Sequence, residues 1–203
     1  DVIIPGTGQD AIAAGDGHDF VEAANVVDEA ALRSSAAGSD DIFDIAFAYD
    51  LPAASDAGDV VDLGAGDDTV LGGDGDDLII GGSGRDVLHG GAGNDAIHGG
   101  DSDDHLEGED GNDVLIANGG NDRALGGRGN DTMRGAEGND SLSAGEGDDR
   151  LLGGTGADTL AGDPGNDIMI GEGGADLLLG GAGRDTLDGS WENDDLFGDE
   201  DDD

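Results

Sequence analysis

The chain has no cysteine, no lysine and few aromatic residues. Its 203 residues include one Trp, one Tyr and four Phe. Without Cys, disulfides and thiolate metal sites are excluded. No apolar run is long enough to cross a membrane as a helix. This composition is not that of an ordinary globular domain.

Positive charge is also scarce. Seven basic residues, all Arg, stand against 50 acidic residues, which gives a formal net charge of −43. This balance argues against nucleic acid as a partner, because phosphates need a basic surface. It argues equally against anionic membrane surfaces, and it favours cations. Acidic chains poor in aromatic residues are typically disordered, unless a regular pattern orders them.

The sequence is rich in glycine and aspartate, which recur with a period of nine residues. A Gly usually stands two positions before the periodic Asp, and an apolar residue two positions after it. A strict short period indicates one small unit that is copied and stacked. The periodic aspartates are Asp59, Asp68, Asp77, Asp86, Asp95, Asp104, Asp113, Asp122, Asp131, Asp140, Asp149, Asp158, Asp167, Asp176, Asp185 and Asp194.

Each unit divides into a Gly-rich turn of six residues and a strand of three, as in GGDGDD and LII at residues 72–80. Glycine accepts positive φ in tight turns, and the middle strand residue points inward because side chains alternate. Two units complete a coil, and coils stack as parallel strands about 4.8 Å apart. The sequence therefore predicts an all-β, two-sheet β-solenoid.

The inward residues predicted for the two sheets form two series. One series is Val61, Ile79, Ile97, Leu115, Met133, Leu151, Met169 and Leu187. The other is Val70, Leu88, Leu106, Ala124, Leu142, Leu160, Leu178 and Leu196.

The period also predicts how the chain is organised. Residues 1–22 contain degenerate N-terminal repeats, and residues 54–203 form the regular solenoid. Residues 23–53 break the frame, so we expect an excursion that packs on the solenoid as a partial cap. Both ends interrupt a unit, and we expect the chain to be part of a longer protein.

Stacking places like charges above one another along two edges, for example Asp77 next to Asp95. Two such charges about 5 Å apart repel by roughly 0.8 kcal/mol in water and by more where partly buried. A divalent cation between successive turns removes this repulsion. Carboxylate and carbonyl oxygens suit Ca²⁺ better than Mg²⁺, whereas Zn²⁺ prefers His or Cys, which the repeat lacks. We therefore predict Ca²⁺ between stacked turns, and a chain that stays unfolded without it.

The unit resembles the nonapeptide of the RTX (repeats-in-toxin, hemolysin-type) family, GGxGxDxUx, in which U is a large apolar residue. GGSGRDVLH at residues 81–89 and GGAGNDAIH at residues 90–98 match every position. The resemblance covers residues 54–197 continuously and residues 1–22 more loosely. It implies a right-handed parallel β-roll, and an extracellular protein secreted from Gram-negative bacteria by a type I exporter.

The resemblance also implies the ligands. The periodic aspartates become side-chain ligands of Ca²⁺, with about one ion per pair of stacked loops and about fourteen ions in all. Asp10 and Asp19 are further candidates in the N-terminal repeats. The backbone carbonyl ligands expected are those of Gly64, Gly66, Gly73, Gly75, Gly82, Gly84, Gly91, Gly93, Gly127, Gly129, Gly145, Gly147, Gly154, Gly156, Gly181 and Gly183.

Some units depart from the pattern. Ser102 and Glu192 replace the fourth-position Gly, and Asn118 replaces the second. We expect weaker Ca²⁺ sites beside these three residues. We also expect local disorder near Ala124, where a small residue thins the core. The second-position Gly is also replaced by Glu109, Asp163, Glu172 and Ser190.

The outer faces give two further expectations. His89 and His98 should lie on opposite sheets as solvated side chains rather than as transition-metal ligands. Exposed apolar pairs on one sheet favour a docking surface for residues 23–53, a partner domain or a second copy. These pairs are Leu78 and Ile80, Val114 and Ile116, and Ile168 and Ile170.

The chain has no His-Glu-x-x-His and no Gly-x-Ser-x-Gly motif, and we predict that it is not an enzyme. Two functions remain open. In the first, a Ca²⁺-dependent folding and secretion module is attached to a larger exported protein and folds where Ca²⁺ is millimolar. In the second, the array is a structural or adhesive solenoid such as a stalk, filament or surface-layer element. The partners expected are Ca²⁺ and other domains of the exported protein, without nucleic acid and without membrane insertion.

Overall fold

The computed structural model describes residues 2–3, 11–16, 20–22 and 58–198. All regular structure in these residues is β-strand. Within these ranges, no helix is long and apolar enough to cross a membrane.

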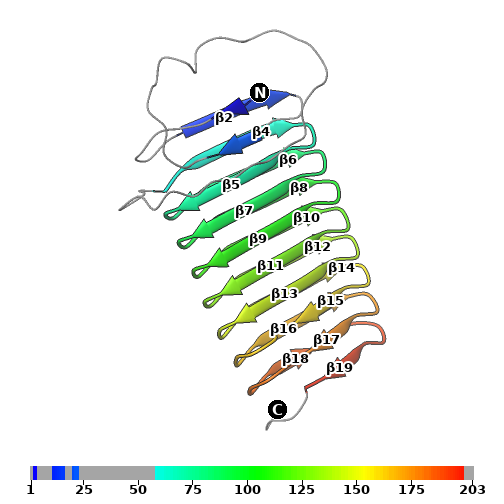
Figure 1. Ribbon diagram of the computed structural model, residues 1–203. Coiled ribbons are helices and arrows are strands. Elements are labelled where there is room, and N and C mark those ends of the chain that lie inside the picture. Colours follow the sequence, from blue (N-terminus) through cyan, green and yellow to red (C-terminus); the bar gives the residue numbers. More distant parts are fainter. Residues whose placement is uncertain (1, 4–10, 17–19, 23–57, 199–203) are drawn as a thin grey trace.

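The strands alternate between two parallel sheets, and their coils stack in order from the N-terminal to the C-terminal end (Figure 1). The ten-stranded sheet contains β1 (Val2–Ile3), β3 (Phe20–Glu22), β5 (Thr69–Asp74), β7 (Val87–Ala92), β9 (His105–Asp110), β11 (Arg123–Arg128), β13 (Ser141–Glu146), β15 (Thr159–Ala161), β17 (Leu177–Leu179) and β19 (Asp195–Phe197). The nine-stranded sheet contains β2 (Ala11–Asp16), β4 (Val60–Ala65), β6 (Leu78–Ser83), β8 (Ala96–Asp101), β10 (Val114–Gly119), β12 (Thr132–Glu137), β14 (Arg150–Thr155), β16 (Ile168–Gly173) and β18 (Thr186–Asp188). The predicted all-β, two-sheet solenoid is confirmed.

Most strands are longer than the three residues predicted. β6 combines the last three residues of one unit with the first three of the next, and its Gly82 pairs in register with Gly64. The second-position glycines take positive φ, +110° at Gly82, without breaking the ladder. The turn proper therefore shrinks to three residues, such as 84–86.

The core is a column of apolar side chains between the sheets. The predicted inward residues from Val61 to Leu178 are buried, Leu187 is partly buried, and Leu196 in the last strand is 42% exposed. The first position of each unit also faces inward, which the sequence analysis missed. Leu63, Ala117 and Ala144 occupy this position and are fully buried.

The earliest strands belong to the same solenoid. β2 pairs with β4, and β3 pairs with β5, although a long segment separates them in sequence. Ile12 aligns with Val61, and Phe20 aligns with Thr69. Residues 23–53 lie outside the described ranges, so their role as a cap and the division at residues 22 and 53 stay predictions.

The local disorder expected near Ala124 is not found, because β10 and β11 are both regular six-residue strands. Asn118 takes φ +77°, in the left-handed region that Asn tolerates better than most residues. Ser102 and Glu192 also adopt positive φ, at +86° and +80°. The backbone thus keeps its path where glycine is replaced.

Candidate metal centre

The periodic aspartates end the three-residue turns and form one ladder along each edge of the solenoid. Neighbours in a ladder are one coil apart, as are Asp77 and Asp95. The turns that carry them line up along the two edges (Figure 1). These acidic residues are buried, since Asp59 to Asp185 are 0–8% exposed. Asp194, the last of the series, is half-buried. They therefore lie between coils and not in bulk solvent.

One carboxylate oxygen of each ladder residue is fixed by the preceding coil. The Asp95 backbone N–H donates to Asp113 Oδ1 at 2.8 Å, and the Asp113 N–H donates to Asp131 Oδ1 at 2.8 Å. The same bond recurs along both ladders, from Asp77 Oδ1 at 2.6 Å to Asp194 Oδ1 at 3.0 Å. Each carboxylate is thereby aimed at the coil before it.

The second oxygen, Oδ2, lies against the first-position glycine of its own unit. A Cβ atom added at Gly108 would collide with Asp113 Oδ2, so the first-position glycine provides the room for this oxygen. Leaving a buried polar atom unpaired costs about 1–3 kcal/mol, and more when it is charged. The buried Oδ2 atoms without a hydrogen-bond partner within the described ranges include those of Asp86, Asp95, Asp104, Asp113, Asp122, Asp131, Asp140, Asp149, Asp158, Asp167 and Asp176.

Burial makes these carboxyl groups resist ionisation. Loss of solvation raises the pKa of Asp104 to about 8; the hydrogen bond from the Asp86 N–H opposes this rise, and the charges of Asp86 and Asp122 add to it. The same causes raise the pKa of Asp95, Asp131 and Asp167 to about 7 and that of Asp122 and Asp158 to about 6. The pKa is also raised, mainly by burial, for Asp86, Asp113, Asp140, Asp149 and Asp176. At neutral pH, the ladders therefore need either protons or cations.

The turn carbonyls lie at the same edges. All the glycines predicted as carbonyl ligands have positive φ, between 100° and 145°. A Cβ atom at Gly84 would collide with the Gly66 carbonyl oxygen, so that oxygen faces the gap between coils. A Cβ atom at Gly111 would lie close to both the Gly93 carbonyl oxygen and Asp113 Oδ1. A carbonyl of one coil and a carboxylate of the next thus border the same space.

This donor set consists of oxygen atoms only. Hard cations such as Ca²⁺ take 6–8 oxygens from carboxylates and backbone carbonyls. The buried Oδ2 atoms and the close carbonyls fit such an ion. Asp10 and Asp19, also predicted as ligands, lie outside the described residues.

A further ladder was missed by the sequence analysis. Asn or Asp often precedes the periodic Asp, and its side chain accepts a bond from the backbone of the next coil. The Asn112 N–H donates to Asn94 Oδ1 at 2.9 Å, and the Asn130 N–H donates to Asn112 Oδ1 at 2.7 Å. The signal was present in the sequence, because Asn recurs at this fifth position at residues 94, 112, 121, 130, 139, 166 and 193.

Comparison with protein families agrees with this geometry. The model of the RTX calcium-binding nonapeptide repeat matches residues 1–25, 54–88, 80–115, 98–133, 107–142, 116–151, 134–169, 143–178 and 170–203. Residues 26–53, which no match covers, fall where the nine-residue period breaks. Comparison with curated proteins gave no match. The chain therefore belongs to the RTX calcium-binding nonapeptide repeat family, and its solenoid is a calcium-binding β-roll.

Proposed function

We propose that this β-roll is the Ca²⁺-dependent folding module of a larger exported protein. RTX repeats are a structural, non-catalytic kind of calcium-binding domain, typical of proteins secreted by bacteria. The chain stays unfolded at the low Ca²⁺ of the cytosol and folds outside the cell. The observation that carries the proposal is the row of buried Oδ2 atoms from Asp86 to Asp176, which have no hydrogen-bond partner within the described ranges.

We assign about one Ca²⁺ to each pair of stacked turns along both edges. The periodic aspartates supply carboxylates from neighbouring coils, and the second- and fourth-position glycines supply carbonyls. An interior residue such as Asp113 borders two gaps, one toward Asp95 and one toward Asp131. An ion in one gap therefore orders a turn that the next site also uses, so filling should be cooperative.

Calcium drives folding in this account because it binds the folded state alone. A site stabilises the native state by RT ln(1 + [Ca²⁺]/Kd). Extracellular Ca²⁺-binding modules typically have affinities of about 10⁻⁴–10⁻³ M, so millimolar Ca²⁺ fills them and cytosolic Ca²⁺ does not. Each ion also offsets part of a net charge of −43.

Far-ultraviolet circular dichroism during a Ca²⁺ titration tests this proposal, with Mg²⁺ as the control. We expect a coil spectrum in chelator, a cooperative gain of β-structure near millimolar Ca²⁺, and a much weaker response to Mg²⁺. β-Structure that persists in chelator at neutral pH would contradict the proposal.

Export by a type I system is the finer part of the proposal. Its test is the amount of protein secreted when the chain is fused to a passenger and a type I export signal. We expect secretion to fall when three interior ladder residues, Asp95, Asp113 and Asp131, are changed to Asn. Equal secretion of this variant and the wild type would show that export does not depend on calcium-driven folding.

A structural or adhesive solenoid is the second candidate. It is favoured by apolar side chains on the outer face of the nine-stranded sheet, where Val114 is 40% exposed and Ile168 is 41% exposed. Near the C-terminal end, Trp191 is 76% exposed and Phe197 is 52% exposed. Sedimentation in Ca²⁺ separates the candidates: a monomer supports the folding module, and growing polymers support the structural element.

The apolar face is also where we propose that residues 23–53 or a partner domain docks. Changing Ile168 and Ile170 to Thr should lower stability or alter the association state if this face is covered. Unchanged stability and an unchanged sedimentation coefficient would count against docking.

A further inference from the structure

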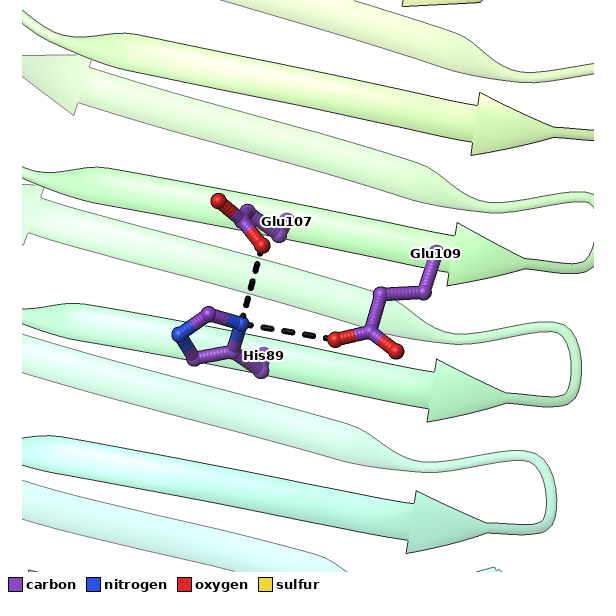
Figure 2. Close-up of side chains that lie close together, drawn as sticks. All are labelled: His89, Glu107 and Glu109. Carbon is purple, nitrogen blue, oxygen red and sulfur yellow. Dashed lines mark ion pairs between the residues drawn. The ribbon is translucent and has the colours of Figure 1, made fainter. Parts of the chain in front are cut away.

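One histidine and two glutamate side chains from neighbouring strands of the ten-stranded sheet converge on one another (Figure 2). His89 Nδ1 lies 3.1 Å from Glu107 Oε2 and 3.4 Å from Glu109 Oε1. One ligand atom from each residue falls within 4.8 Å of the others. Isolated solvated histidines were expected here, and His89 is instead 23% exposed within a cluster.

The register of the solenoid builds this cluster. His89 in β7 aligns with Glu107 in β9, and Gly91 aligns with Glu109. Glu107 and Glu109 are two residues apart on one strand, so their side chains share a face. His89 and Glu109 are about 20 residues apart in the sequence. The three side chains meet because β7 and β9 are neighbouring strands of one sheet.

A second histidine holds the cluster in place. His105 Nε2 lies 2.8 Å from Glu107 Oε1, the oxygen that does not face His89. The rings of His105 and His89 meet edge to face, with centroids 6.3 Å apart. Glu107 is therefore oriented by His105 while its other oxygen points at His89.

We propose that His89 Nδ1, Glu107 Oε2 and Glu109 Oε1 form a binding site for a transition-metal cation of the Zn²⁺ class. Ligands about 2.0–2.2 Å from a tetrahedral Zn²⁺ lie about 3.3–3.5 Å from one another. The 3.4 Å distance from the imidazole nitrogen to Glu109 Oε1 matches that spacing, and the 3.1 Å distance to Glu107 Oε2 is slightly shorter. Two carboxylates and one neutral imidazole give a charge that one divalent ion neutralises.

The donor types separate this site from the aspartate ladders. Imidazole nitrogen favours Zn²⁺ and similar metals, whereas Ca²⁺ takes oxygen ligands. Three protein ligands leave one tetrahedral position open for water or an external ligand. His105 is a positioning residue, because an outer-shell bond to a ligating carboxylate fixes its orientation.

His98 provides a matched control within the same chain. It lies in β8 on the other sheet, where its register partners are Ile80 and Ile116. Those neighbours carry no metal ligand, so His98 offers an imidazole without the two carboxylates. If Zn²⁺ bound to any accessible histidine, it would bind equally at His98 and at His89.

The test is Zn²⁺ calorimetry on the full chain in excess Ca²⁺, which keeps the aspartate ladders filled. We expect one Zn²⁺ equivalent in the wild type and in His98→Ala, and at least tenfold weaker binding in His89→Ala. Glu109→Gly should weaken Zn²⁺ binding similarly while suiting the backbone, because Glu109 has φ +78° where most units have Gly. Circular dichroism in Ca²⁺ verifies that each variant is folded.

Histidine side-chain NMR identifies the ligand atom. Zn²⁺ should shift Nδ1 of His89 and leave His98 unchanged. His105→Ala should weaken Zn²⁺ binding, and His105→Gln, which keeps a donor toward Glu107, should restore it. Wild-type affinity in His89→Ala, or equal shifts at His89 and His98, would overturn the site.

The expectation that Ca²⁺-driven folding assembles this site rests on the proposed function. A comparison of Ca²⁺-free and Ca²⁺-bound protein distinguishes a failure of the metal site from a failure of calcium-driven folding. Chelator-treated protein, freed of chelator before Zn²⁺ is added, should lack the His89 signal because β7 and β9 are not stacked. A His89 signal in that sample would support the metal site and contradict calcium-driven folding. No His89 signal in Ca²⁺-folded protein would contradict the metal site and leave calcium-driven folding standing.

Discussion

At the scale of single residues, the two oxygens of each ladder carboxylate have separate roles. In Asp113, Oδ1 accepts the Asp95 N–H at 2.8 Å, and Oδ2 is buried without a hydrogen-bond partner within the described ranges. An Asn side chain could supply the first oxygen but not the negative charge. An acidic side chain at a buried position where an amide could make the same hydrogen bond therefore points to a bound cation.

Replacing Asp113 with Asn should have opposite effects with and without calcium. The amide oxygen keeps the hydrogen bond. In the presence of Ca²⁺, the variant therefore loses stability only because a charged ligand of the ion is missing. We expect the Ca²⁺ midpoint of folding to rise about tenfold. Without Ca²⁺, the variant should be no less stable than the wild type, because a buried charge has been removed.

The matched control is Asp101→Asn, since Asp101 is exposed at the third position of its unit. Calcium titrations followed by circular dichroism compare the three proteins. Equal shifts of the midpoint in both variants would contradict a special role for Asp113.

The turn glycines differ in how much a side chain would disturb them. Gly84 has φ +124°, and an added Cβ would collide with the Gly66 carbonyl oxygen. Gly119 has only one neighbour near an added Cβ, the Gly100 carbonyl oxygen at 3.9 Å. Gly84→Ala should therefore destabilise the Ca²⁺-bound roll by at least about 1–2 kcal/mol, and Gly119→Ala should be near neutral. Urea unfolding in saturating Ca²⁺ measures both, and equal losses would contradict the close approach of coils at Gly84.

At the scale of strands and turns, the bonds between coils come from side chains as well as from the sheets. Asn130 Oδ1 accepts the Asp148 N–H at 2.7 Å and Asn139 Oδ1 accepts the Ala157 N–H at 2.7 Å. These fifth-position ladders satisfy turn N–H groups that the parallel sheets do not reach. They hold successive turns in register beside the carboxylates.

Removing one rung of this ladder should have a modest cost. Asn130→Ala deletes the acceptor of the Asp148 N–H and should lower the free energy of unfolding by about 0.5–1.5 kcal/mol. Asn130→Asp keeps an acceptor and should retain most of the wild-type stability. Denaturant unfolding in Ca²⁺ compares them, and a neutral Ala variant would show that water replaces the bond.

The sequence could predict the sheets but not every contact between them. The nine-residue period and the alternation around Ile79 were enough for two parallel sheets and an inward column. The full strand length does not follow from the sequence, because glycine favours turns and yet Gly82, with φ +110°, stays in register in the ladder. The His89 cluster was missed because it depends on side-chain rotamers across β7 and β9, which no spacing rule gives.

At the scale of the whole molecule, the charge of the ladders makes folding depend on pH. In the folded state without metal, burial raises the pKa of Asp104 to about 8 and of Asp131 to about 7, from an ordinary value of 3.8. A raised pKa means that the folded state binds protons more tightly than the unfolded state. Proton binding by these buried aspartates therefore stabilises the metal-free folded state below pH 4. This stabilisation is lost as pH rises through 6 to 8.

The metal-free chain should therefore gain β-structure on acidification from pH 8 to pH 4. Ca²⁺ competes with the same protons, so its apparent affinity should increase from pH 5 to pH 8. Two exposed groups act in the opposite direction, because hydrogen bonds from Asn121 and Asn166 lower the pKa of Asp103 and Asp148. Circular dichroism at several pH values, with and without Ca²⁺, checks both trends, and a midpoint independent of pH between 6 and 8 would contradict them.

The most direct test is a crystal structure grown in Ca²⁺, with anomalous scattering used to locate the ions. The account predicts ions between successive turns along both edges, in contact with Oδ2 of residues such as Asp95, Asp113 and Asp131. Gaps without ions at saturating Ca²⁺, or ions found only on the outer faces of the sheets, would contradict it.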